Sequence, residues 1–184
     1  MTILTASTNA ITLFIQGYFS ELKISGGSIG LIYGIGTVLS AAVFINSHYL
    51  IKLKLKSILI LTTIMYFVGA VFLITLNVPL VIVGFFLIYL QVDFLEPSVY
   101  YFINQEVKEE ARTTVLSSLG AGYSLVTLLL YPLYGVIGQS YGYRGMILIS
   151  VVLSSPLFAY LFRFYQKYNV GKINHNPESE RTTI

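Results

Sequence analysis

The sequence predicts an all-α integral membrane protein with six transmembrane helices. Of its 184 residues, 55% are hydrophobic and 10% are charged, whereas a soluble domain carries roughly 25% charged residues. Six apolar stretches approach or exceed the roughly 20 residues that cross a bilayer, and short polar breaks separate them. The stretches lie near residues 2–20, 28–50, 57–76, 79–103, 114–138 and 143–165. We therefore expect a six-span domain in the lipid bilayer over residues 1–165, and a polar tail over 166–184 that is predicted to be disordered because it lacks periodicity.

The positive charges of the connecting segments predict the orientation. In the six-span arrangement, one side of the membrane receives only Lys23 and Arg144. The opposite side receives nine basic residues: Lys52, Lys54, Lys56, Lys108, Arg112, Arg163, Lys167, Lys172 and Arg181. Lys and Arg are enriched in cytoplasmic loops. Because the number of spans is even, both termini are expected in the cytoplasm, as in a multi-pass protein of the cell membrane.

The first span carries a polar stripe. At 100° per residue, its polar side chains fall within about 80° of one another; they are Thr2, Thr5, Asn9, Thr12, Gln16 and Ser20. A span that faces lipid alone does not need such a stripe. Two interpretations stay open, hydrogen bonding between helices and the wall of a cavity, and one helix can serve both.

Small residues mark one face of the second span. Gly30 and Gly34 form a GxxxG spacing, continued by Thr37 and Ala41, and small residues let helix backbones approach closely. The third span follows the segment IKLKLK at residues 51–56. Its alternation is compatible with a strand, but its place at a membrane edge favours charge anchoring.

The fourth span contains Asp93 and Glu96, the only charged residues between Lys56 and Glu106. Insertion of a carboxylate into lipid costs about 2.5–3.5 kcal/mol. Helical spacing places both acids on one stripe with Tyr89 and Tyr100. Pro97 removes the backbone hydrogen bond to the carbonyl of Asp93. An ionisable side chain and a free backbone acceptor therefore lie at the same depth in the bilayer. These residues are a candidate solute or proton pathway, and snorkelling to the interface is the alternative for Glu96.

The fifth and sixth spans combine small residues with proline. Gly120 and Gly135 belong to a small-residue face of the fifth span, which predicts close helix packing. Pro132 and Pro156 interrupt these two spans. Broken helices line cavities in many transporters.

The sequence gives little support to catalysis, metal binding or nucleotide use. It has no cysteine, and neither His48 nor His175 has a partner at the spacing of a metal site or a catalytic triad. No GxxxxGK[ST] phosphate loop is present, and the first twenty residues lack the features of a cleaved signal peptide. We expect no catalytic residues, no cofactor, no metal and no nucleic-acid partner. An intramembrane protease built on Asp93 and Glu96 is disfavoured, because such enzymes place their two acids on different helices.

The segment EVKEEARTTVLS at residues 106–117, followed by a glycine-rich span, resembles the loop between helices ten and eleven of major facilitator superfamily transporters. There, as at Arg112, an arginine followed by small hydroxylated residues opens the eleventh helix. The segment YPLYGVIGQSYGYRGMI at 131–147 resembles the end of that helix, although Gln139 stands where relatives often have an acid. Gln16 with Tyr18 resembles helix seven. Independently, Glu109 and Glu110 beside Arg112 suit a helix start and a pairing partner, with a solvated charged loop as the alternative.

The resemblance covers residues 1–165 and implies the C-terminal six-helix half of a twelve-helix fold. Two such halves enclose a midplane site and alternate its access, so it implies a small-molecule solute and a partner: a separate N-terminal half or a second copy of this chain. The implied function is transmembrane transport of a small solute, with proton coupling at Asp93 as the leading candidate. The alternative is a non-transporting membrane fragment or interaction protein from a truncated gene, which the immediate start in a span favours.

Overall fold

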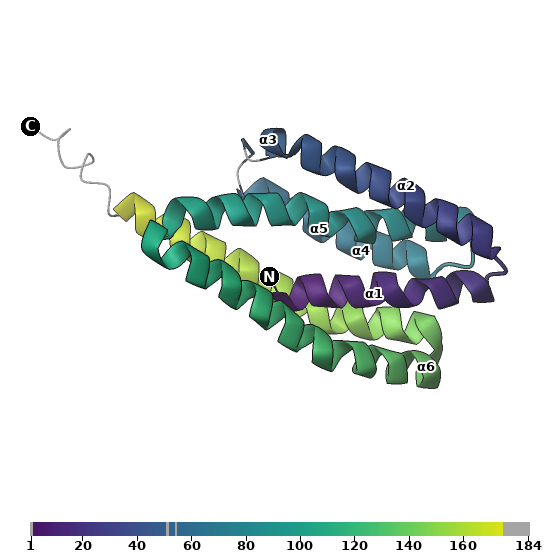
Figure 1. The fold of residues 1–184 in the computed structure, drawn as a ribbon. Helices are drawn as coiled ribbons and strands as arrows, with labels where there is room; N and C mark the ends of the chain where they lie inside the picture. Colours follow the sequence, from purple (N-terminus) through teal and green to yellow (C-terminus); the bar gives the residue numbers. More distant parts are fainter. Residues whose placement is uncertain (1, 51, 54, 175–184) are drawn as a thin grey trace, which may run out of the picture.

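The computed structural model of the chain describes residues 2–50, 52–53 and 55–174, and every regular element within them is a helix. The helices are α1 (Thr2–Glu21), α2 (Gly26–Ile45), α3 (Ser47–Leu50), α4 (Leu55–Ile74), α5 (Val78–Glu106) and α6 (Glu109–Asn174). The long helices run side by side, and α6 doubles back on itself (Figure 1). The prediction of an all-α protein is confirmed.

Side-chain caps begin two of the long helices. The Ser25 hydroxyl accepts a hydrogen bond from the backbone N–H of Ser28 at 3.2 Å, at the start of α2. The Asn77 side chain accepts from the backbone N–H of Leu80 at 3.3 Å, and Pro79 occupies the first turn of α5. Ser and Asn satisfy the free N–H groups of a first turn, and Pro has no N–H to leave unsatisfied. These local signals explain why both helices start after short polar breaks.

α6 consists of two helical arms joined at Gly142. Gly142 has φ 69° and ψ 171°, a backbone conformation that residues with a Cβ rarely adopt. We call residues 109–141 the first arm and residues 143–174 the second arm. The two arms contain the predicted fifth and sixth spans, 114–138 and 143–165, with the turn between them where the sequence predicts a break.

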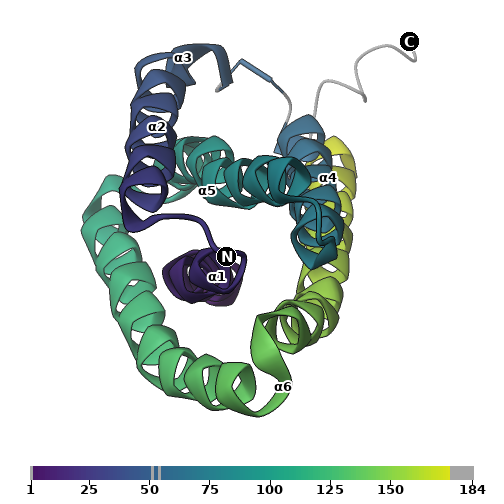
Figure 2. The same cartoon turned by 90° about the vertical axis from the view of Figure 1, so that its right-hand side faces the viewer.

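α1 lies at the centre of the molecule. Viewed end-on, the other long helices surround it (Figure 2), and half of its residues are buried, including Thr5, Ser7 and Thr8. A helix enclosed by protein does not need an apolar surface all round. The enclosure covers the polar stripe only in part, because Thr5 is buried whereas Gln16 and Ser20 are exposed.

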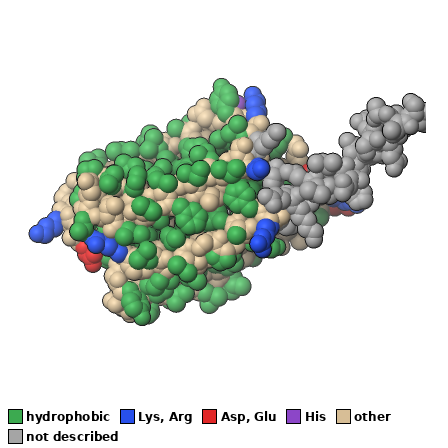
Figure 3. Space-filling model, turned by 180° about the vertical axis from the view of Figure 1, so that it is seen from behind, with side chains coloured by type: hydrophobic (Ala, Val, Ile, Leu, Met, Phe, Trp, Pro, Cys, Tyr) green, Lys and Arg blue, Asp and Glu red, His purple; other side chains and the backbone are tan. Residues whose placement is uncertain are grey.

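Four described helices, α2, α4, α5 and α6, are long and apolar enough to cross a membrane, with α6 counted once. α1 is not among them, because of its polar stripe. Hydrophobic side chains cover the flank of the molecule, whereas Lys and Arg side chains gather at its two ends (Figure 3). The protein therefore has the surface of a multi-pass membrane protein, and six crossings stay a prediction.

A close helix crossing joins α4 to α5 at two glycines. A Cβ atom on Gly84 would lie 2.7 Å from the backbone oxygen of Gly69, and one on Gly69 would lie 2.9 Å from the backbone oxygen of Gly84. Only residues without a side chain fit there. The predicted glycines behave differently: Gly30, Gly34 and Gly120 face open space, and a Cβ atom on Gly135 would make only an ordinary contact with the Phe14 ring at 3.6 Å.

Within the described residues, Gly30, Gly34 and Gly120 have no neighbouring helix against them, so their role in helix packing stays a prediction. The GxxxG spacing places small residues on one face of α2, but it does not determine which face meets a neighbour. In α2 the buried residues are Ile32 and Gly36, which lie on another face.

Three element boundaries differ from the prediction. α2 ends at Ile45, and the separate short helix α3 covers the end of the predicted second span. In the basic segment, the described residues Lys52 and Leu53 form a turn and a bend rather than a strand, and α4 begins at Leu55. α6 continues to Asn174, beyond the predicted span end at 165. The rest of the predicted disordered tail, 175–184, lies outside the described residues.

Candidate functional site

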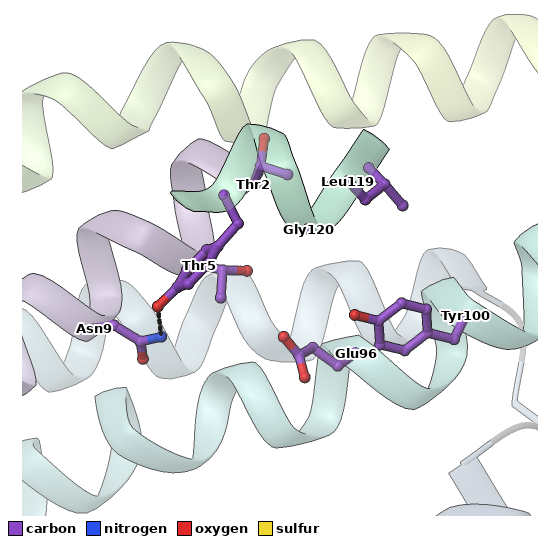
Figure 4. A pocket seen from close by; sticks show the side chains of 8 residues that line it. Thr2, Thr5, Asn9, Glu96, Tyr100, Leu119 and Gly120 are labelled. Atoms are coloured by element: carbon purple, nitrogen blue, oxygen red, sulfur yellow. Dashed lines mark hydrogen bonds between the residues drawn. The ribbon is translucent and has the colours of Figure 1, made fainter. Parts of the chain in front are cut away.

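A cavity of about 290 Å³ lies between α1, α5 and the first arm of α6. Its lining residues are Thr2, Thr5 and Asn9 from α1, Glu96 and Tyr100 from α5, and Leu119, Gly120 and Tyr123 from α6 (Figure 4). Three of the six predicted pathway residues, Asn9, Glu96 and Tyr100, thus meet in one place. We call this space the α1–α5–α6 cavity.

α1 supplies the polar wall of the cavity. The Asn9 side-chain amide donates a hydrogen bond to the Tyr123 hydroxyl at 2.9 Å and so connects α1 to α6. Thr5 is 4% exposed, and its hydroxyl is buried without a hydrogen-bond partner. That hydroxyl points into the space between α1 and α5 (Figure 4). A buried hydroxyl without a partner is unfavourable.

α5 supplies the charge of the cavity. Glu96 is half-buried, and its carboxylate projects from α5 toward the α1 wall, beside Tyr100 (Figure 4). α5 continues as a helix through Pro97. Because Pro97 has no N–H, the carbonyl of Asp93 lacks its helical partner. A carboxylate and a free backbone acceptor therefore lie within one turn of the same helix.

Asp93 is directed away from this cavity. The Ser40 side chain of α2 is near enough to influence its carboxyl, while its Oδ2 atom is buried without a hydrogen-bond partner. Asp93 and Glu96 remain close enough to interact electrostatically. The predicted acidic stripe is thus divided, with Glu96 in the cavity and Asp93 against α2.

The other two predicted pathway residues, Tyr89 and Gln16, meet around Tyr33 of α2. The rings of Tyr33 and Tyr89 are 6.3 Å apart between centroids and nearly perpendicular. The Tyr33 hydroxyl donates to the backbone oxygen of Thr12, and the Gln16 side chain lies within its hydrogen-bonding range. The six predicted residues therefore lie in three places. Asn9, Glu96 and Tyr100 line the α1–α5–α6 cavity, Asp93 lies toward α2, and Tyr89 and Gln16 lie near Tyr33.

A buried amide connects α1 to α5. The Thr8 hydroxyl donates to the Gln91 side-chain oxygen at 3.1 Å, and Gln91 is fully buried with its Nε2 atom unpartnered. This amide stands in an otherwise apolar part of α5. Its hydrogen bond joins the central helix to the helix that carries both acids.

Arg112 ties the start of α6 to the end of α5. Its guanidinium Nη2 donates to the backbone oxygen of Asn104 at 2.8 Å, one of the last carbonyls of α5, which have no partner inside the helix. Glu109 and Glu110 occupy the first turn of α6, where acidic side chains interact favourably with the helix dipole. The site offers no metal centre: within the described residues no three His, Asp or Glu side chains are grouped to hold an ion.

A comparison with protein families identifies the architecture. The sequence profile described as Major Facilitator Superfamily matches residues 1–183. The chain belongs to the major facilitator superfamily. No curated protein and no solved structure matches it. Members of this superfamily are transporters rather than enzymes, so membership indicates membrane transport in general as the role of this chain.

Three polar residues of this superfamily member escaped the sequence interpretation: Tyr123, Tyr33 and Gln91. None of them belongs to a polar stripe that the sequence interpretation identified. Gln91 carries the one available signal, because an amide in a long apolar span needs a partner inside the protein. For the two tyrosines, only the assembled helices reveal the contacts with Asn9 and Thr12.

Proposed function

We propose that this chain forms one six-helix half of a secondary transporter for a small solute. The observation that carries the proposal is the α1–α5–α6 cavity, a polar space with a carboxylate in a protein whose flank is apolar. In this arrangement α1, α2, α4, α5 and the two arms of α6 all cross the membrane. The solute contacts Asn9, Glu96 and Tyr100.

Two faces that lack neighbours within the chain support a second half. On the first arm of α6, a depression of about 370 Å³ is lined by Thr113, Thr114, Ser117, Ser118 and Ala121. On α2, Gly30, Gly34 and Thr37 are exposed. Both helices lie on the same side of the molecule (Figure 2). Small and hydroxylated residues are typical of helix contacts within membranes, so a second half, either an N-terminal half or another copy of this chain, covers that side.

Asp93 is the proposed site of proton coupling. It is held against Ser40 of α2 rather than in the cavity, so its protonation can change an α2–α5 contact without blocking the solute. Glu96 is the proposed solute contact and the second candidate for coupling. Rocking of the two halves against each other then opens the cavity first to one side of the membrane and then to the other.

The distribution of basic residues supports the orientation. The α2–α4 connection, the α5–α6 junction and the end of α6 lie at one end of the molecule (Figure 1), where Lys52, Lys56 and Lys108 belong. By the excess of Lys and Arg in cytoplasmic loops, we place this end and both termini in the cytoplasm of a cell membrane.

Uptake into vesicles tests the function. The chain is extracted from its membrane with its neighbours, reconstituted, and supplied with a panel of radiolabelled cationic, anionic and neutral solutes under an imposed proton gradient. We expect saturable uptake of one solute class that depends on the gradient. Asp93→Asn should remove the dependence on the gradient while solute exchange persists.

If Asp93→Asn leaves the gradient dependence unchanged, the coupling role is wrong. If folded protein takes up no solute of any class, the non-transporting alternative replaces transport.

A further inference from the structure

The charge of the α1–α5–α6 cavity has one sign. Its single charged lining residue is the carboxylate Glu96, and no Lys, Arg or His of the described residues lines it. The phenol ring of Tyr100 stands beside the carboxylate (Figure 4), and that of Tyr123 lines the same cavity from α6. Aromatic faces attract cations within about 6 Å of the ring centre, and a carboxylate in a partly buried site attracts them more strongly than one in water.

The cavity also offers hydrogen-bonding groups to an uncharged part of a ligand. The Thr5 hydroxyl is buried, unpartnered and directed into the space. The Asn9 amide nitrogen is already used in the bond to Tyr123, which leaves its carbonyl oxygen as an acceptor. The polar wall on α1 and the charge on α5 thus lie on opposite sides of the cavity.

We propose that the cavity binds a small organic cation that also carries a hydrogen-bonding group, such as an amino alcohol. The ammonium group lies against Glu96 between the two tyrosine rings, and the hydroxyl or amide of the ligand reaches Thr5. Cavities of about 300 Å³ and above hold small-molecule ligands, and about 290 Å³ in this half alone suits a ligand of that kind. This inference rests on the proposed transport function and specifies its solute class.

A pair of probes isolates the charge. Choline and 3,3-dimethylbutan-1-ol have the same shape and the same hydroxyl, but only choline is charged. Equilibrium binding of each is measured to the full chain, extracted from its membrane directly into lipid nanodiscs. We expect choline to bind saturably and at least about tenfold more tightly than the neutral alcohol, since a desolvated cation–aromatic contact with a nearby carboxylate is worth that much.

Two variants test separately the contact with the ammonium group and the contact with the hydroxyl group of the ligand. Glu96→Gln should weaken choline binding at least about tenfold and leave the neutral alcohol unchanged. Thr5→Val should weaken both probes by a similar factor of about five, since both lose the same hydrogen bond. The matched control is Glu21→Gln, which removes an exposed carboxylate at the end of α1 outside the cavity and should leave choline binding unchanged.

Equal binding of the two probes, the absence of choline binding, or a Glu96→Gln variant that binds choline like the wild type would each overturn the proposal. Binding without flux in the vesicle assay would instead contradict the transport function and leave the cation site intact, so the two failures are distinguishable.

Discussion

Tyr66 connects α4 to both arms of α6 through a chain of buried hydroxyls. The Tyr134 hydroxyl donates to Ser150 at 2.8 Å, and the Tyr66 hydroxyl donates to Ser154 at 3.0 Å. The remaining contact joins Tyr66 and Ser150 at 2.9 Å. Since the Ser150 oxygen already accepts from Tyr134 and the Tyr66 proton is committed to Ser154, Ser150 donates to Tyr66. All four side chains are fully buried, so each hydroxyl depends on the others.

Tyr66→Phe removes the central member of this chain. The Ser150 proton and the Ser154 oxygen each lose a partner in a place without water, and we expect the free energy of unfolding to fall by about 1–2 kcal/mol. Thermal unfolding in detergent measures the change. Tyr141→Phe is the control, because Tyr141 is 72% exposed and the loss of its hydroxyl should have little effect. Equal midpoints for the two variants would contradict the role of the hydroxyl chain.

For individual residues, the sequence predicted part of the candidate site. Asn9, Glu96 and Tyr100 were recognised because polar residues in apolar spans are conspicuous, and all three line the cavity. The separation of Asp93 from Glu96 was not predictable. Helical spacing places the two acids on one stripe, but a stripe is wide enough for its members to face different neighbours, here Ser40 and the cavity. Tyr123 was missed because a single tyrosine within an apolar span gives no periodic signal.

Helix crossings show what a residue pattern alone leaves open. Gly30 and Gly34 have the spacing associated with close packing and face open space, whereas Gly69 and Gly84 have no such spacing and form a close crossing. Single glycines on two different helices give no periodic signal. Their pairing becomes visible only when α4 and α5 lie together. The helices themselves were predictable, since apolar length and polar breaks depend on local sequence.

Gly84→Ala tests the α4–α5 crossing. The added methyl group would lie 2.7 Å from the backbone oxygen of Gly69, and because a backbone atom cannot rotate away, we expect a destabilisation of about 1–3 kcal/mol. Gly34→Ala is the matched control, with nothing within 4 Å of the added atom. Thermal unfolding of both variants provides the comparison. Unfolding of Gly84→Ala at the wild-type temperature would show that the crossing is looser than the structure describes.

On the scale of the whole molecule, the loops alternate between two ends of the bundle, and α6 turns back at Gly142 (Figure 1). The proposed orientation therefore places the α5–α6 junction in the cytoplasm and the turn between the arms outside. The positive charges alone predict this arrangement. α1 was predictable as a helix but not as the centre of the bundle, because its place depends on five other helical segments.

Cysteine labelling tests the crossings without a background, since the natural chain contains no cysteine. Lys108→Cys lies at the α5–α6 junction and Tyr141→Cys at the turn of α6. We expect a membrane-impermeant thiol reagent applied to intact cells to label Tyr141→Cys, and to label Lys108→Cys only after the cells are opened. The unsubstituted chain is the control. Labelling of both positions from the same side would mean that the first arm of α6 does not cross the bilayer.

Photo-crosslinking at Ser117 tests most directly the central claim that a second half completes the cavity. Ser117 lines the exposed depression on the first arm of α6, and Val152 on the second arm is 70% exposed. A photoreactive benzophenone amino acid is placed at either position in the native membrane, and the adducts are analysed by mass. We predict a protein adduct at Ser117, with an N-terminal half or with a second copy of this chain, and lipid adducts at Val152. Lipid adducts alone at both positions would contradict the account.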